Sequence, residues 1–283
     1  VFIGQGASNN TMGGSEPGAG NVISGNHNHG IRLAGRGTEQ NRVQGNIIGP
    51  DATGTGRLPY LSPLFLPRGN VLSGVRIEQG AARNLIGGRR AGEGNLISAN
   101  GEDGVSLVED SETGLTTENE VLGNRIGTQT GGTVPLGNDR SGVRLQATGN
   151  RVGGSEADAG NVISGNLQSG VAILGNGNVI EGNFIGTDPA GLISVANQQA
   201  GVRVEGATNR IGGAVAAAGN IISGNLGPGL LVQGDRATHN EITANVIGLS
   251  ANGLVLPNNT DGVRLTGNAR FNRVGGPPSS APN

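Results

Sequence analysis

The chain has 283 residues, of which 56 are glycine, with a net charge of −2, 2% aromatic residues, and no cysteine or tryptophan. The absence of cysteine excludes a disulfide framework and a thiolate site, and because all 19 basic residues are arginine, a lysine base is excluded as well. The small net charge gives no bulk reason to expect nucleic acid or an anionic membrane as a partner, and no apolar run is long enough for a membrane span.

Three short phrases recur along the chain. The first is Asn-x-(Ile/Val/Met)-Gly-Gly, which starts at Asn10, Asn84, Asn150, Asn209 and Asn272. The second is Gly-(Val/Ile/Leu)-x-(Leu/Ile/Val), which starts at Gly30, Gly74, Gly104, Gly142, Gly170, Gly201, Gly229 and Gly262, with Val1-Phe2-Ile3 as a truncated further copy. The third is (Gly/Ala)-Asn-x-Ile, which starts at Gly20, Gly45, Gly94, Gly123, Gly160, Gly182, Gly219 and Ala244.

Each phrase holds a short stretch in which apolar residues alternate, as in a β-strand, and none shows the spacing of a helix. Glycine and asparagine stand at the ends of the phrases, where corners require positive φ. Three strands per copy, repeated about nine times, predict an all-β solenoid: a right-handed parallel β-helix with stacked asparagines joined from coil to coil.

We expect one β-helix domain over residues 1–276, excised from a longer chain because Val1-Phe2-Ile3 fits the middle of a repeat. Residues 277–283, rich in proline and serine, are predicted to be a linker or tail. Two kinds of coil alternate, and the tighter kind is followed by a long excursion, at residues 50–73, 128–141, 187–200 and 249–261. The first excursion is the longest and contains Tyr60 and Phe65 among prolines, so it is a candidate functional loop.

The repeats resemble the secreted and cell-surface right-handed parallel β-helix repeat proteins, a group with the pectate-lyase-like fold. The resemblance is carried by Gly160-Asn-Val-Ile-Ser-Gly-Asn, its two sister copies from Gly20 and Gly219, Ile185-Gly-Thr-Asp and Gly201-Val-Arg-Val. It implies the fold over roughly residues 1–276, but it leaves the function open, because the group includes polysaccharide lyases, hydrolases and epimerases, phage tailspikes and bacterial surface proteins.

The outward position of the second phrase carries a row of arginines. These are Arg32, Arg76, Arg144, Arg203 and Arg264, and a second row comprises Arg42, Arg151, Arg210 and Arg273. Spaced guanidinium groups suit the carboxylates or sulfates of an anionic polysaccharide. The alternative is a solvated face in which the arginines pair with Glu78, Glu205 and other acids.

Strict alternation would also expose the residue before the isoleucine of the third phrase. That row is apolar except for Arg125, and it consists of Val22, Ile47, Leu96, Val162, Phe184, Ile221 and Val246. An exposed row of this kind would serve self-association. The alternative, which we favour, is that the excursions cover the row or that the strand bends so that both residues face the core.

The remaining polar features give no clear catalytic or metal motif. His27 and His29 could share a zinc ion but lack a third ligand nearby, and the acids from Glu102 to Glu118 lack the pattern of a calcium loop. No cofactor is therefore expected, although calcium is possible. Asp103 precedes a strand, but no second acid occupies the equivalent place in an adjacent coil, as acid–base hydrolysis would require.

The sequence thus favours a non-catalytic extracellular or cell-surface scaffold, bacterial in origin, for structure, adhesion or glycan binding. Its ligand-binding candidates are the five arginines of the first row together with Tyr60 and Phe65, and its partners would be a polysaccharide or cell-surface glycan and the flanking domains. One alternative is a polysaccharide lyase or glycoside hydrolase acting on an acidic glycan, and a second is a tailspike-like fibre. No nucleic acid or membrane span is expected.

Overall fold

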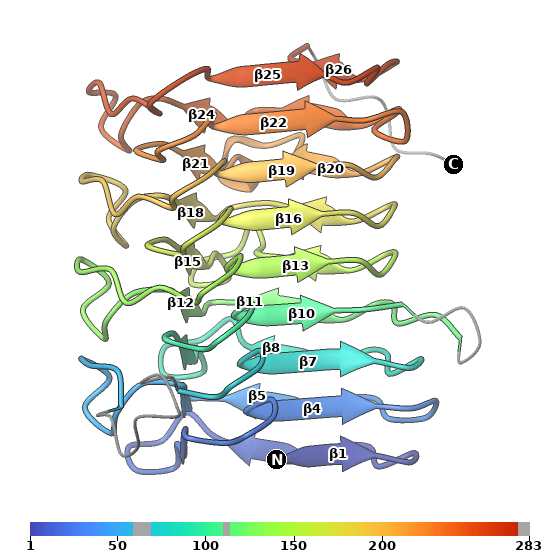
Figure 1. Ribbon diagram of the computed structural model, residues 1–283, viewed down its shortest axis with the longest axis vertical. Coiled ribbons are helices and arrows are strands. Elements are labelled where there is room, and N and C mark those ends of the chain that lie inside the picture. Colours follow the sequence, from blue (N-terminus) through green and yellow to red (C-terminus); the bar gives the residue numbers. More distant parts are fainter. Residues whose placement is uncertain (59–68, 110–113, 277–283) are drawn as a thin grey trace.

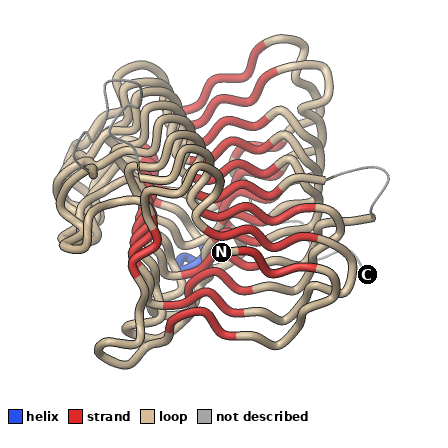
Figure 2. Tube along the Cα trace, turned by 60° about the horizontal axis from the view of Figure 1, so that its bottom comes forward, coloured by secondary structure: helices blue, strands red, loops and turns tan. Residues whose placement is uncertain are grey.

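The computed structural model describes residues 1–58, 69–109 and 114–276, and these residues form a stack of nine coils whose strands build three sheets, of nine, nine and eight strands (Figure 1). Figure 2 shows the strands running around the stack in successive layers. All strand pairs within the three sheets are parallel. The parallel β-helix predicted from the repeats is therefore confirmed.

Sheet A contains the nine strands formed by the second phrase, and its first strand confirms the truncated copy at the start of the chain. Its strands are β1 (Phe2–Gly4), β4 (Ile31–Ala34), β7 (Val75–Glu78), β10 (Val105–Leu107), β13 (Val143–Leu145), β16 (Val171–Ile173), β19 (Val202–Val204), β22 (Leu230–Gln233) and β25 (Val263–Thr266).

Sheet B contains the nine strands that follow the asparagine of the first phrase or of its tighter variants. Its strands are β2 (Thr11–Gly13), β5 (Arg42–Gln44), β8 (Leu85–Gly87), β11 (Glu120–Leu122), β14 (Arg151–Val152), β17 (Val179–Ile180), β20 (Arg210–Gly212), β23 (Glu241–Thr243) and β26 (Arg273–Val274).

Sheet C contains the eight two-residue strands of the third phrase. Its strands are β3 (Val22–Ile23), β6 (Ile47–Ile48), β9 (Leu96–Ile97), β12 (Arg125–Ile126), β15 (Val162–Ile163), β18 (Phe184–Ile185), β21 (Ile221–Ile222) and β24 (Val246–Ile247). The only helix in the described residues is the short 3-10 turn η1 (Ala216–Ala218), which cannot cross a bilayer.

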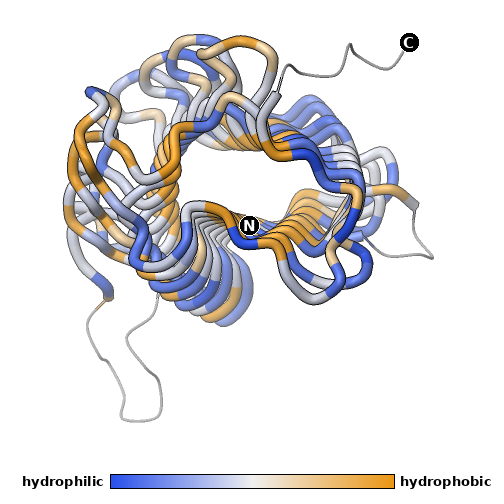
Figure 3. Tube along the Cα trace, turned by 90° about the horizontal axis from the view of Figure 1, so that it is seen from above, coloured by the Kyte–Doolittle hydropathy of each residue, from blue (hydrophilic) through white to orange (hydrophobic). Residues whose placement is uncertain are grey.

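The core is a narrow apolar column inside the coils, visible as the hydrophobic inner lining in Figure 3. Within β4, for example, Ile31 and Leu33 are fully buried while Arg32 between them points outward. Each coil buries its inward Val, Ile and Leu residues against the coils above and below, so a chain with few aromatic residues still forms a continuous core.

Three rows of asparagines close the corners of the coils, as the sequence predicted. In the row before sheet C, from Asn21 to Asn245, each Nδ2 donates to the Oδ1 of the next asparagine at 2.8–3.0 Å. Equivalent rows run from Asn10 to Asn272 before sheet B and from Asn26 to Asn258 before sheet A. Most of these side chains are buried, so the rows satisfy polar groups that would otherwise be stranded inside the coil.

A steric constraint explains the first glycine of the Gly-Gly pair in the first phrase. Gly87 has a φ of +88°, and a Cβ atom at this position would lie 1.9 Å from the carbonyl oxygen of Leu122 in the next coil. Only glycine fits there. The corner before the asparagine row of sheet B also turns through positive φ, but this corner is exposed and uses residues other than glycine, such as Gln40, Arg83 and His239.

The described parts of the four excursions lie beside one another along one side of the stack (Figure 1). Thr130 N donates to Gly54 O at 3.1 Å, and Ala251 N donates to Gly191 O at 2.8 Å, so each bond joins two excursions. Gly54 and Gly191 also lie against the side chains of Leu96 and Phe184 in sheet C. The excursions therefore form a flange over sheet C.

The flange affects how far the apolar row of sheet C is exposed to solvent. Leu96 and Val162, in the middle of the stack, are only 8% and 7% exposed, whereas Val22 and Val246 near its two ends are 51% and 38% exposed. Of the two explanations in the favoured alternative, cover by the excursions and a bend of the strand, cover by the excursions accounts for the burial of Leu96. A continuous exposed stripe is not present.

Candidate binding site: a groove over sheet C

The five arginines predicted to bind ligand do form one outward column on sheet A. Strand register aligns the outward residues of successive coils, in the order Phe2, Arg32, Arg76, Ser106, Arg144, Ala172, Arg203, Leu231 and Arg264. Two coils separate the arginines from Arg76 onward, which corresponds to about 10 Å.

Most arginines of this column form ion pairs with carboxylates that lie in or beside sheet A. Glu78 accepts from Arg32 at 2.6 Å and from Arg76 at 2.7 Å, and Arg203 lies 3.0 Å from Glu205. Arg264 pairs with Asp261. These contacts match the alternative of a face neutralised by its own acids.

Arg144 differs from the others because it forms no ion pair with any described residue. Two residues after Arg76 and Arg203 the chain carries Glu78 and Glu205, but two residues after Arg144 it carries Gln146. Without this carboxylate, the Arg144 guanidinium still interacts electrostatically with the buried Asp103.

Asp103 is the most perturbed acid in the described residues. It is 2% exposed, and its carboxylate accepts a bond of 3.0 Å from the backbone N–H of Ser141 in the next coil. Burial raises the pKa of this carboxyl to about 6, although Arg144 and the Ser141 bond act in the opposite direction. In the coils before and after, the position equivalent to Asp103 holds Ser73 and Ser141, so no second acid occupies it, as the sequence predicted.

A large groove lies elsewhere, over sheet C. It is a groove of about 710 Å³ that runs across five coils, and its floor is the outward row Ile47, Leu96, Arg125, Val162 and Phe184. One wall consists of the loops between sheets B and C, at residues 90–92 and 154–158, and the other consists of the excursion residues Thr130 and Pro189. Its floor spans about 19 Å, at roughly 4.8 Å per coil.

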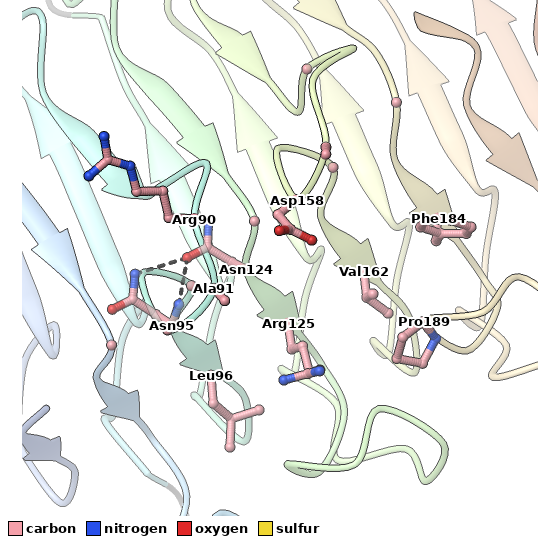
Figure 4. Close-up of a pocket in the computed structure, with 18 of the residues that line it drawn as sticks. Arg90, Ala91, Asn95, Leu96, Asn124, Arg125, Asp158, Val162, Phe184 and Pro189 are labelled. Carbon is pink, nitrogen blue, oxygen red and sulfur yellow. Dashed lines mark hydrogen bonds between the residues drawn. The ribbon is translucent and has the colours of Figure 1, made fainter. Parts of the chain in front are cut away.

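Arg125 stands in the middle of this floor, flanked in register by Leu96 and Val162. Figure 4 shows its guanidinium reaching toward the side that carries Pro189, whereas Asp158 lies toward the opposite wall. Arg125 is exposed and forms no ion pair or hydrogen bond through its side chain with any described residue, and the same holds for the side chain of Arg90 on the wall.

The groove therefore combines an apolar floor with a central cation and separated charges on its wall. Arg90 and Arg125 are positive, Asp158 is negative, and Glu156 is engaged by Arg89 at 3.4 Å. Such a site can hold an extended chain by apolar contact and fix it at one point through a bidentate bond from Arg125.

Other predicted site residues do not join this groove. Tyr60 and Phe65 lie outside the described residues. His29 accepts from the backbone N–H of Ser73, and its pKa is lowered by burial and by Arg76. Within residues 1–58, 69–109 and 114–276 no three His, Cys, Asp or Glu side chains gather as a metal site.

Sequence reasoning reached the groove only in part. Arg125 was visible as the single charge in an apolar row, and that irregularity was the available signal. Arg90 and Asp158 gave no signal, because both stand in corner loops whose direction depends on the coils around them.

No protein-family model, no curated protein and no solved structure matches this chain.

Proposed function

We propose that this β-helix is a binding scaffold for an acidic glycan, which it holds as an extended chain in the groove over sheet C. The observation that carries the proposal is Arg125: an exposed guanidinium without a partner among the described residues, set in a groove floor between Leu96 and Val162. Ile47 and Phe184, the partly exposed apolar residues of the floor, can contact the faces of sugar rings, and Arg125 supplies the fork that recognises a carboxylate.

The groove supports this role better than the arginine column of sheet A does. Arg32, Arg76 and Arg203 already have carboxylates within 3.0 Å, so a glycan carboxylate would have to displace them, and Arg144 alone in this column lacks an ion pair with a described residue. Arg125 has no such competitor to displace. An unpaired charge beside apolar surface gains more from a ligand than a charge already neutralised in the fold.

The resemblance to secreted and cell-surface proteins with the pectate-lyase-like fold supports an extracellular setting for this binding. A long groove parallel to the stack is also what a regular polymer needs, because successive coils present successive contacts at a fixed spacing.

The test is calorimetric titration with a short oligogalacturonate at low salt. Wild-type protein should bind it, and the Arg125→Gln variant should bind about tenfold or more weakly, because a charge-assisted hydrogen bond is lost. Arg264→Gln is the matched control, since it removes the same charge from the neutralised column of sheet A. Equal binding by wild type and Arg125→Gln would overturn the proposal.

Two further arms separate the alternatives. The methyl-esterified oligomer, which lacks the carboxylate, should bind no better to wild type than to Arg125→Gln. Mass analysis of the oligogalacturonate after incubation should show it intact, whereas shortened or unsaturated products would instead favour a polysaccharide lyase or hydrolase.

A further inference from the structure

A second site lies on sheet B, where the repeat loses a carboxylate that it carries elsewhere. The outward column of sheet B reads Thr11, Arg42, Leu85, Glu120, Arg151, Val179, Arg210, Glu241 and Arg273 in successive coils. Arg151, Arg210 and Arg273 all have glutamate partners in this face. Arg42 has no side-chain partner among the described residues, because Thr11 and Leu85 flank it.

The cause is the residue that stands two places after the outward position in this coil and in its two neighbours. Glu181 on the face of sheet B pairs with both Arg151 and Arg210, on the coils before and after it. The position in the coil of Arg42 that corresponds to Glu181 holds Gln44, which is 6% exposed and donates from Nε2 to Gly87 O at 3.1 Å. On the coils before and after Arg42, the residues in register with Gln44 are Gly13 and Gly87, so neither the strand of Arg42 nor its two neighbours offers Arg42 a carboxylate at this position.

A pocket of about 510 Å³ surrounds this arginine. Its lining includes Asn9, Thr11, Gln40, Arg42 and Arg83, and no carboxylate residue lines it. Asn9 and Gln40 belong to the corner with positive φ, at 58° and 56°. Arg83 is already engaged by Glu39, so Arg42 is the cation in the pocket that remains to be neutralised.

We infer that this pocket binds the oxyanion of a single sugar unit, a carboxylate or a sulfate ester, through Arg42. Thr11, Asn9 and Gln40 provide hydroxyl and amide groups that can bond the ligand oxygens around the anion. The site is separate from the groove, because Arg42 stands on sheet B and Arg125 stands on sheet C.

The experiment is a titration of the protein with sodium glucuronate and, separately, with glucose 6-sulfate, followed by amide NMR shifts. Shifts should occur at Thr11 and Arg42 with one or both ligands and not with glucose, and the two arms show which oxyanion is preferred. Absence of these shifts with both anions would overturn the inference.

Two variants test the cause. Arg42→Gln removes the cation, and Gln44→Glu restores the carboxylate found at Glu181, so each should weaken binding about tenfold or more. Arg210→Gln removes an arginine that is already paired and should leave binding unchanged. Unchanged affinity in Arg42→Gln, in a variant whose circular dichroism shows a folded protein, would contradict the inference whatever happens at Arg125.

Discussion

The inner corners and the outer faces of these coils both carry rows of polar residues, but the two kinds of row are built in opposite ways. At the corners, asparagine repeats in nearly every coil, is mostly buried and bonds the next asparagine. On sheets A and B, arginines alternate with small, apolar or acidic residues and are partly exposed. The buried rows hold the coils together, so they tolerate little change, whereas the exposed rows can vary, and the variations at Arg125 and Gln44 mark the candidate sites.

The largest effect should come from breaking a corner row. Asn161 is fully buried, donates to Val121 O and Asn183 Oδ1, both at 2.8 Å, and accepts from the backbone and side chain of Asn124. Asn161→Ala should lower the free energy of unfolding by about 3 to 5 kcal/mol, because four bonds are lost and their partners stay buried. Denaturant unfolding measures the loss.

Asn176→Ala is the control for that experiment, since this asparagine is exposed and its side chain accepts one bond, from the Ala207 N–H. It should cost about 1 kcal/mol or less. Similar losses in the two variants would show that burial in the row does not set the importance of an asparagine.

Asp103 should make stability depend on pH. Its pKa is raised from 3.8 to about 6 in the fold, so the folded protein binds more protons than the unfolded chain between these values. Stability is therefore greatest at low pH for this group and falls as pH rises from about 4 to about 6, by up to about 3 kcal/mol. The Asp103→Asn variant should lack this component, which is measured as the difference between the two proteins in unfolding free energy across that range. The same pH slope in both proteins would refute the assignment.

A smaller effect on the free energy of unfolding is expected from Glu78, which lies in the partly buried section of the sheet A column. Glu78→Gln removes the carboxylate that engages both Arg32 and Arg76, and it should cost about 1 kcal/mol at low salt, because both arginines remain partly solvated. Burial raises the pKa of Glu78, but the bonds from the two arginines outweigh it and lower the pKa overall, so this stabilisation should be lost as pH falls below the ordinary range of glutamate. Chemical denaturation at low and high salt measures the loss, and an equal cost at both salt concentrations would argue against an ion pair.

The smallest effect is expected at the exposed end of the same column. Arg264 and Asp261 are both about half exposed, at 48% and 47% for their side chains. Arg264→Gln should change the unfolding free energy by no more than about 0.5 kcal/mol. A loss as large as that of Glu78→Gln would mean that solvent exposure does not determine how much each ion pair of sheet A contributes to stability.

The repeating part of the fold could be predicted from the sequence because a few neighbouring residues determine each strand and each corner. Alternation around Arg32 places Ile31 and Leu33 in the core, and the glycines after Asn84 mark a corner where a side chain would collide with the next coil. The sites were harder to predict. The groove depends on how the excursions lie against Leu96 and Phe184, and the raised pKa of Asp103 depends on burial that no single phrase encodes.

The asparagine rows also give the stack a net dipole along its axis. Backbone bonds around the coils alternate, since Ile31 N donates toward the coil of β7 while Arg32 N donates back to Val1 O, so their dipoles largely cancel. The side-chain amides do not alternate: from Asn10 to Asn240 and in the other two rows, the bonds between asparagines run from donor to acceptor toward the coil of β25. Their dipoles add, as peptide dipoles do in an α-helix, with the positive pole at the C-terminal coil. Negative groups are therefore favoured at that pole, and positive groups at the opposite one.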